Sequence, residues 1–363
     1  MSSGRYDYID ALRGVAICGV LTIHVGLASP DIHFLLLKLS EYGAVGVKLF
    51  FIVSAMTFCY SMSGKEFDPR TFYIRRFFRI APMFYIAGIV YPYVFSVNSN
   101  HNIWNDYNLY DYILTFTFLH GFFPEAINKV VPGGWSIACE MIFYAALPFL
   151  LHFITNMKRA LIATFFSFLL AYSWRLSMRF FFDASEMMDN FILFGFLSNL
   201  PAFLCGISIY QFLKTSFAQG LALRLRRNFT AEVLVMGVLG LLIMVALSPY
   251  RHVQDPLVSI VVISIFVLAT ALSGTRLINN KLFRYLGVVS YSLYLVHFLF
   301  LMILLPIAQR LAISPDAGFV VGFILVSSFS VCVAGITYRY IEIPMIELGR
   351  RLTVRSRSVA VGG

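Results

Sequence analysis

Long apolar segments recur along this chain, and they constrain its fold more than any other feature. Each is about 17–25 residues long, the length that an α-helix needs to cross a bilayer. The segments are residues 8–28, 43–62, 78–97, 135–155, 160–176, 190–213, 230–248, 256–273, 287–308 and 317–340. The sequence therefore predicts an all-α, polytopic transmembrane bundle of about ten spans.

The composition agrees with a membrane protein. Charged residues make up 13% of the 363 residues, whereas a soluble domain carries roughly 25%. The apolar segment Tyr112–Phe123 is too short to cross and is followed by Pro124, which predicts a re-entrant or interfacial piece. We expect one integral-membrane domain over residues 1–345 and a basic, disordered tail over residues 346–363.

Basic residues are distributed unevenly between the connecting loops. Ten crossings put both termini on one side, and 19 Lys and Arg then fall on that side against six on the other. Loops rich in Lys and Arg stay in the cytoplasm, so both termini are predicted to be cytoplasmic. This placement accounts for the net charge of +10 without a nucleic-acid partner.

The first span carries polar residues that are costly in a bilayer and are therefore usually functional. Arg13 would lie about 8 Å from its cytoplasmic end, and His24 about 16 Å further along. The fourth span runs in the opposite direction, which puts Glu140 at a depth similar to that of His24. A carboxylate beside a histidine orients the ring and stabilises its cation, as a general base requires. The alternative for His24 is a helix–helix contact.

Three arginines lie together at the cytoplasmic mouth of the third span. Arg75, Arg76 and Arg79 are three and four residues apart, so a helix would present them as one cluster. The planar guanidinium suits phosphate oxygens. Positive-inside anchors have the same pattern, so phosphate binding and anchoring both stay open.

Several common catalytic signatures are missing. The chain has no Walker loop, GxGxxG, HExxH or GxSxG motif,. Its five cysteines fall in apolar stretches without paired spacing,. We therefore expect neither a metal site nor a disulfide framework.

Six motifs occur in order, and together they resemble the membrane acyltransferase-3 family over nearly the whole chain. The sequence departs from the family at Ala55, where a glycine is frequent. The motifs are D-x-L-R-G-x-A…H from Asp10, G-V-x-L-F-F-x-x-S from Gly46, R-R-x-x-R-I-x-P from Arg75, W-S-x-x-x-E-x-x-F-Y from Trp135, L-G-x-x-S-Y-S-L-Y-L-x-H-F from Leu286, and E-x-P from Glu342.

The resemblance implies an O-acyltransferase of a bacterial cytoplasmic (inner) membrane. Such enzymes take an acyl group from cytoplasmic acyl-CoA, usually acetyl-CoA, and place it on a hydroxyl of an extracytoplasmic glycan or glycolipid. The matching histidine is regarded as the catalytic base, and the matching arginines as donor-binding groups. The roles carried over are therefore catalytic for His24, with Glu140 orienting it, and donor-binding for Arg13, Arg75, Arg79 and, more weakly, Arg76.

Four further residues are candidates for contacting the substrates or the developing oxyanion, although the sequence does not choose among them. Three of them belong to the tryptophan motif. The fourth lies in the ninth span, where a packing role is equally open. They are Trp135, Ser136, Tyr144 and His297.

A secondary transporter that exports an anionic or acylated metabolite is the rival class. Transporters usually show two related halves with paired broken helices, and we find no such halves. For the enzyme, the expected partners are the bilayer, an acyl-CoA and a sugar or lipid-linked glycan, with a homo-oligomer left open. Acceptor identity, acyl length and direct transfer versus an acyl-enzyme also stay open.

Overall fold

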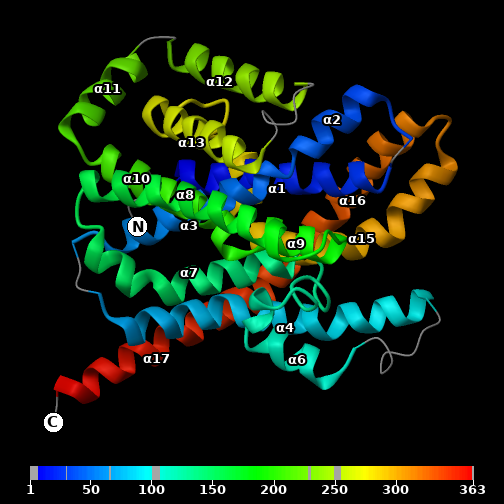
Figure 1. The fold of residues 1–363 in the computed structure, drawn as a ribbon, viewed down its shortest axis with the longest axis horizontal. Helices are drawn as coiled ribbons and strands as arrows, with labels where there is room; N and C mark the ends of the chain where they lie inside the picture. The colour runs from blue at the N-terminus through cyan, green and yellow to red at the C-terminus, as the bar shows by residue number, and fades with distance from the viewer. Residues whose placement is uncertain are drawn as a thin grey trace.

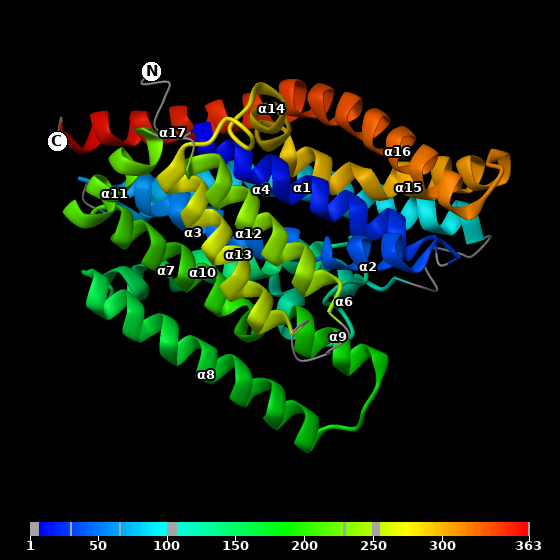
Figure 2. The ribbon, with the colours of Figure 1, turned by 90° about the horizontal axis from the view of Figure 1, so that it is seen from above.

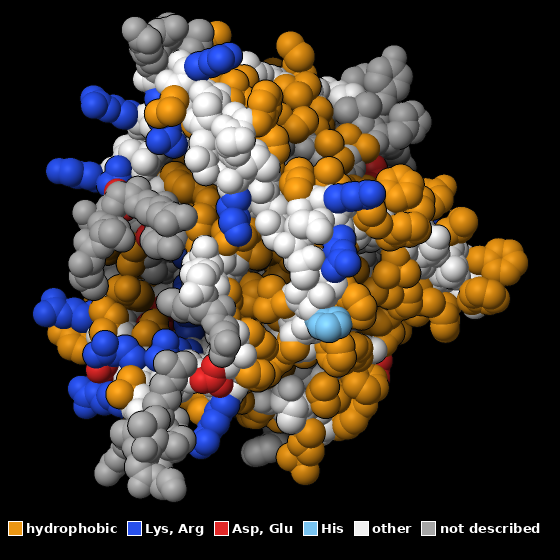
Figure 3. All heavy atoms as spheres, turned by 90° about the vertical axis from the view of Figure 1, so that its left-hand side faces the viewer, with side chains coloured by type: hydrophobic (Ala, Val, Ile, Leu, Met, Phe, Trp, Pro, Cys, Tyr) orange, Lys and Arg blue, Asp and Glu red, His pale blue; other side chains and the backbone are white. Residues whose placement is uncertain are grey.

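The computed structural model describes residues 7–29, 31–64, 67–99, 107–227, 230–248 and 255–361. The regular structure in this part of the chain is helical throughout. The long helices lie roughly along one direction, horizontal in Figure 1. Helix α1 (Asp7–Leu27) begins, and helix α17 (Ile343–Val361) ends, at the same end of the bundle (Figures 1 and 2). Lys and Arg side chains gather on that face (Figure 3), which we call the basic end.

The predicted polytopic bundle is confirmed. Within the described residues, nine helical segments are long and apolar enough to cross a membrane, and α12 (Thr230–Ala246) is a shorter apolar helix in place of the tenth. The nine segments comprise α1; α2 (Phe34–Tyr42) with α3 (Val45–Met62); α4 (Pro69–Ser99); α7 (Gly134–Phe153); α8 (Met157–Phe181); α9 (Glu186–Phe194) with α10 (Phe196–Leu213); α13 (Pro256–Ser273); α15 (Ser290–Leu311); and α16 (Pro315–Thr337) with α17.

Short elements connect these helices. The segment predicted to be re-entrant contains α6 (Leu109–Phe116) and a 3₁₀ turn, η1 (Leu119–Phe122), neither of which is long enough to cross,. Phe118 between them has a left-handed backbone (φ 61°) that turns the chain. The remaining connectors are α11 (Ser216–Arg227), α14 (Lys281–Val288) and a π-helical turn, η2 (Tyr338–Glu342).

The helices divide into central and peripheral ones. The most apolar window of α9–α10 is 72% buried, whereas that of α8 is only 11% buried. Figure 2 shows α8 standing at one side of the bundle. Its exposed Phe165, Phe166 and Phe180 suit a surface covered by lipid tails.

Glycines allow α1 to pack closely against its neighbours. A Cβ at Gly287 of α14 would lie 1.7 Å from the carbonyl oxygen of Asp10, and one at Gly46 of α3 would lie 2.4 Å from that of Ala16. Small residues let helix backbones approach in membranes. These contacts hold α1 between α3 and α14, and so fix the helix that carries Arg13 and His24.

Two features differ from the sequence prediction. The predicted span 190–213 is two helices that break at Gly195. The tail expected to be disordered from residue 346 is instead helix α17, which packs along α4 (Figure 1). The Nε of Arg75 on α4 donates a hydrogen bond to Thr353 Oγ1 on α17 (3.0 Å), so tertiary contacts order a stretch whose own composition is polar.

Candidate active site

A wide cavity opens between α1, α3, α4 and α17. Its volume is about 970 Å³, and five arginines line it together with Asp10 and Asp68. The arginines are Arg13, Arg75, Arg76, Arg79 and Arg350. We call this cavity the arginine mouth, and the sequence had placed four of its five arginines in the donor-binding set.

The arginines of the mouth are held in different ways. Arg13 donates to Asp10 Oδ1 (3.2 Å) and to Thr57 Oγ1 (3.0 Å). The Arg76 guanidinium lies 5.0 Å from the centroid of the Tyr144 ring. Arg79 makes no hydrogen bond or ion pair within the described part of the chain. Its guanidinium therefore keeps its donors for a ligand.

A narrower cavity of about 80 Å³ continues from the mouth into the bundle. Arg13, Arg76 and Arg79 line both cavities, so they mark where one meets the other. The other polar side chains of this interior cavity are Ser54, Ser136, Glu140, Tyr144, Ser290, Tyr291 and Tyr294. A guanidinium-lined entrance therefore leads to a chamber rich in hydroxyl groups.

Glu140 sits at the centre of a hydroxyl cluster in the interior cavity. Its carboxylate accepts hydrogen bonds from Ser54 Oγ and from the Tyr144 hydroxyl, whose oxygens are 3.1 Å apart. Tyr144 is four residues after Glu140 on α7, which puts both on one helix face. Ser54 joins the cluster from α3.

His24 does not contact Glu140 in the described structure, so the predicted pairing is not formed. Its half-buried ring lies against His297 and Phe298 of α15, with ring centroids 5.2 Å and 4.4 Å away. His24 is also not among the residues that line the interior cavity. The depth argument placed the residues along their helix axes, but it did not fix the directions in which their side chains point.

His297 is fully buried, and the hydrogen-bonding capacity of its ring is only partly used. Its Nδ1 lies 2.7 Å from the carbonyl oxygen of Tyr294. A carbonyl only accepts, so Nδ1 carries the proton and Nε2 is left as an acceptor. That Nε2 is buried and has no hydrogen-bond partner in the part of the chain described. A basic nitrogen is therefore free close to the His24 ring.

Tyr294 connects this histidine pair to the interior cavity, which it also lines. Its ring centroid is 5.9 Å from that of His297. Its hydroxyl donates to the Gly133 carbonyl (2.9 Å) and lies 2.9 Å from Ser136 Oγ. The motif spacing Y-x-x-H puts Tyr294 and His297 on one face of a helix, a signal that the sequence contained.

Trp135 points away from the interior cavity. Its ring stacks on that of Phe194 (centroids 4.5 Å apart, planes at 13°) and lines a different pocket, beside Lys48. Glu342 is also outside the cavity and accepts a hydrogen bond from buried Ser292. Its carboxyl group also interacts electrostatically with the Arg79 guanidinium.

The comparisons with known proteins bear on this site as a whole. The profile of a family described as an acyltransferase domain (Acyl_transf_3) matches residues 6–339, and so includes every candidate site residue except Arg350. No curated protein and no solved structure gives a match. Because that profile covers well over half of the sequence, this chain belongs to the acyltransferase-3 family.

Proposed function

We propose that the protein is an O-acyltransferase that moves a short acyl group, with acetyl as the expected one, from cytoplasmic acyl-CoA to a hydroxyl of an extracytoplasmic glycan or glycolipid. The observation that carries the proposal is the arginine mouth that continues into the interior cavity. Membership of an acyltransferase family supports the chemistry. The gathering of Lys and Arg at the same end (Figure 3) supports a cytoplasmic mouth.

The arginine mouth suits the phosphates of coenzyme A. Planar guanidinium groups bind phosphate oxygens through paired, charge-assisted hydrogen bonds. Arg75 and Arg79 lie one helical turn apart on α4, and Arg350 approaches the same cavity from α17. In this proposal, the phosphates stay in the wide mouth while the pantetheine arm passes Arg13 and Arg79 toward the interior.

The interior cavity suits a small acyl group. A volume of about 80 Å³ is far below the roughly 300–1,000 Å³ of pockets for drug-sized ligands. Tyr144, Ser54 and Ser136 line this cavity, and their hydroxyls now donate to Glu140, Gly133 and Tyr294. A hydroxyl that turns from its present acceptor to the thioester oxygen can stabilise the oxyanion that develops when the carbonyl is attacked.

His24 is proposed as the general base, with His297 as its partner. His24 takes the proton of the acceptor hydroxyl as the oxygen attacks the thioester carbon. The tetrahedral intermediate then expels the coenzyme A thiolate, which receives that proton from His24. The free Nε2 of His297 can accept a hydrogen bond from the His24 imidazolium. This fixes the ring and stabilises its charge, the role that the sequence had given to Glu140.

Glu140 is proposed to position the hydroxyl cluster. It binds the Ser54 and Tyr144 hydroxyls and lies in the cavity that Arg13 and Arg76 also line. Tyr294 and His297 stand between this cavity and His24. Transfer therefore requires the side chain of Tyr294 to move so that the thioester and the imidazole can meet.

The test is a transfer assay on the purified protein in lipid nanodiscs. The expected result is release of coenzyme A from acetyl-CoA that depends on added extracted surface glycans, with one acetyl group gained by the product in mass spectrometry. His24→Ala should abolish this release, whereas His152→Ala, an exposed histidine on α7, should not change it. Glycan movement across the membrane of sealed proteoliposomes, without any coenzyme A release, would instead identify an exporter.

A further inference from the structure

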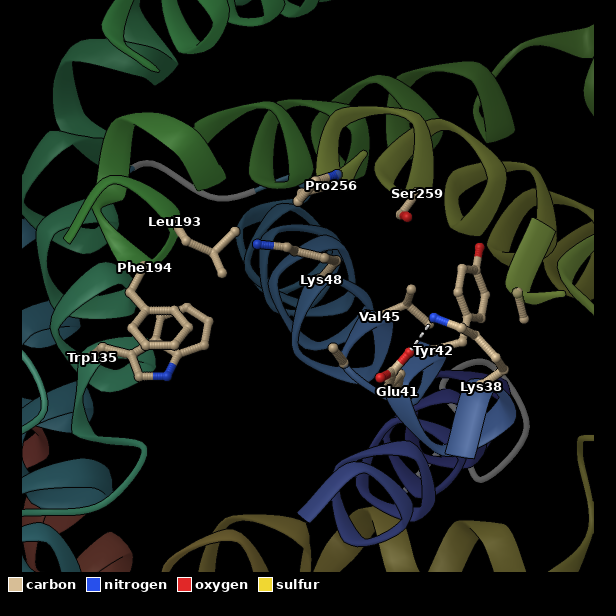
Figure 4. A pocket seen from close by; sticks show the side chains of 12 residues that line it. Lys38, Glu41, Tyr42, Val45, Lys48, Trp135, Leu193, Phe194, Pro256 and Ser259 are labelled. Atoms are coloured by element: carbon tan, nitrogen blue, oxygen red, sulfur yellow. Dashed lines mark hydrogen bonds and ion pairs between the residues drawn. The ribbon is translucent and has the colours of Figure 1, made fainter. Parts of the chain in front are cut away.

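A second pocket lies at the opposite end of α3 from the arginine mouth. Its volume is about 220 Å³, and it is formed by the ends of α2, α9 and α12 and the first turns of α3, α7 and α13. We call it the Lys48 pocket. The lining residues that matter here are Lys38, Tyr42, Lys48, Trp135, Phe194 and Ser259 (Figure 4).

Lys48 brings an ammonium group into the protein interior. The residue is only 7% exposed, and its Nζ donates a hydrogen bond to Asn199 Oδ1. Asn199 is held in turn because its Nδ2 donates to the carbonyls of Leu193 and Gly195, where α9 and α10 break (3.2 and 2.9 Å). In Figure 4 the amine points from α3 toward Leu193 and the stacked Trp135–Phe194 rings.

The charges around this pocket leave Lys48 without an anionic partner. Lys38 at the rim is paired with Glu41 (2.8 Å, dashed in Figure 4). Arg175 is paired with Asp255 at the start of α13 (3.0 Å). Within the described residues, the partner of Lys48 is thus a neutral amide. A buried charge is stable only when it is compensated, so an anionic ligand would supply what the protein does not.

Two further features favour a hydroxylated ring as the body of that ligand. The buried Tyr42 hydroxyl lines the pocket, and its neighbour there is the Ser259 side chain. Figure 4 shows it near Ser259, across the pocket from the aromatic pair. The stacked Trp135 and Phe194 rings form one apolar wall of the pocket. A sugar ring has an apolar C–H face for such a wall and hydroxyls for Tyr42 and Ser259.

We propose that the Lys48 pocket binds one acidic sugar residue, with its carboxylate on Lys48 and its ring on the Trp135–Phe194 wall. Resting on the proposed function, this makes the acceptor an acidic glycan and the pocket its entry site. Trp135 also meets Phe51 edge to face (6.1 Å), and Phe51 lines the interior cavity. Two side chains, Trp135 and Phe51, therefore separate a sugar in this pocket from the interior cavity.

The test is a binding titration that does not depend on acyl transfer. With Trp104 and Trp174 replaced by Phe, Trp135 is the only tryptophan of the three and reports on its own pocket. In phosphatidylcholine nanodiscs, glucuronate should change Trp135 fluorescence saturably, whereas glucose and acetate at equal concentration should act at least about tenfold more weakly. This follows because hydrogen bonds to charged groups contribute about 1.5–3 kcal/mol.

Two variants sharpen this test. Lys48→Met should weaken glucuronate binding at least about tenfold, and Lys158→Met, an exposed lysine on α8, should leave it unchanged. Tyr42→Phe keeps the ring but removes the hydroxyl beside Ser259, so it should weaken glucuronate binding several-fold.

Three results would overturn the proposal: no saturable response to glucuronate, an equal response in Lys48→Met and the parent, or a response to phosphatidylglycerol nanodiscs that glucuronate cannot compete with. The last would identify a lipid headgroup site. Acetyl-CoA binding to the arginine mouth is titrated in the same samples. If acetyl-CoA binds and glucuronate does not, the pocket assignment fails while the proposed function stands.

Discussion

The imidazole rings of His24 and His297 lie with their centroids 5.2 Å apart, on helices α1 and α15. The Nδ1 of His297 is engaged by the Tyr294 carbonyl, and its Nε2 is buried and unpaired within the described chain. The His297 ring is fully buried, whereas the His24 ring is half-buried. This contact replaces the expected carboxylate–histidine pair with a pair of histidines.

Replacing His297 should therefore impair catalysis more than binding. We expect His297→Phe to lower kcat by about 10²-fold or more, at the lower end of general acid–base contributions. The KM values for acyl-CoA and acceptor should change less than threefold, because His297 lines neither cavity. Steady-state kinetics of the purified variant, with His152→Ala as the control, would measure both. A rise in KM at unchanged kcat would show a binding role instead.

Glu140 and His297 should act independently, because they belong to separate contact groups. Glu140→Gln keeps an oxygen that can accept from Tyr144 but removes the negative charge beside Arg13 and Arg76. We expect a moderate loss of kcat that adds to the loss in His297→Phe within about 0.5 kcal/mol. A double-mutant cycle, with kcat measured for the parent, the two single variants and the double variant, tests this. A coupling energy above about 1 kcal/mol between the two substitutions would show that Glu140 and the histidines act together.

Donor binding should depend most on Arg79, which makes no hydrogen bond or ion pair among the described residues. Loss of one charge-assisted contact costs about 1.5–3 kcal/mol, so Arg79→Ala should weaken acetyl-CoA binding about 10- to 100-fold. Arg79→Lys should recover part of that loss, because it keeps the charge but not the planar fork. Calorimetric titration with acetyl-CoA, against Lys158→Met as control, tests this. Equal affinity in Arg79→Ala and the parent would exclude this arginine from the donor site.

Helix α17 should contribute to the donor site, because Ile346 and Arg350 line the arginine mouth. Ending the chain after residue 345 should weaken acetyl-CoA binding and release Arg75 from Thr353. Ending it after Val354 should leave binding unchanged, since both lining residues and Thr353 remain. If both truncated proteins fold and bind equally well, α17 is not part of the mouth.

The close approach of α1 and α14 predicts a sharp difference between two glycines. Gly287→Ala puts a Cβ 1.7 Å from the Asp10 carbonyl oxygen, and overpacking of this kind costs about 1–3 kcal/mol. Nothing lies within 4 Å of a Cβ at Gly237 of α12, so Gly237→Ala should be neutral or stabilising by up to about 1 kcal/mol. Thermal unfolding in detergent compares the two. Equal stability would mean that α1 and α14 separate easily.

Several features followed from the sequence because they depend on local pattern. The length of the apolar segments predicted the spans. An α-helix forms all its backbone hydrogen bonds internally and can therefore cross a bilayer. The i, i+4 spacing of Arg75 and Arg79 predicted a shared face, and both do line the arginine mouth. The brevity of residues 112–123 excluded a crossing there, as α6 and η1 confirm.

Other features depended on how the helices pack. The break at Gly195 creates the carbonyls that hold Asn199, and Asn199 then receives Lys48 from another helix. The order in α17 depends on its contact with α4. Neither can be predicted from the segment alone, because the stabilising partners are distant in sequence.

By itself, the sequence determined that the chain is a bundle of long apolar helices, roughly how far along its helix each polar side chain sits, and which family the chain resembles. The tertiary structure alone decided that His24 faces His297 rather than Glu140, and that Trp135 faces Lys48 rather than the interior cavity. Helical rise converts residue number into depth, but the rotation of each helix about its axis depends on packing against its neighbours. That rotation selects which side chains meet.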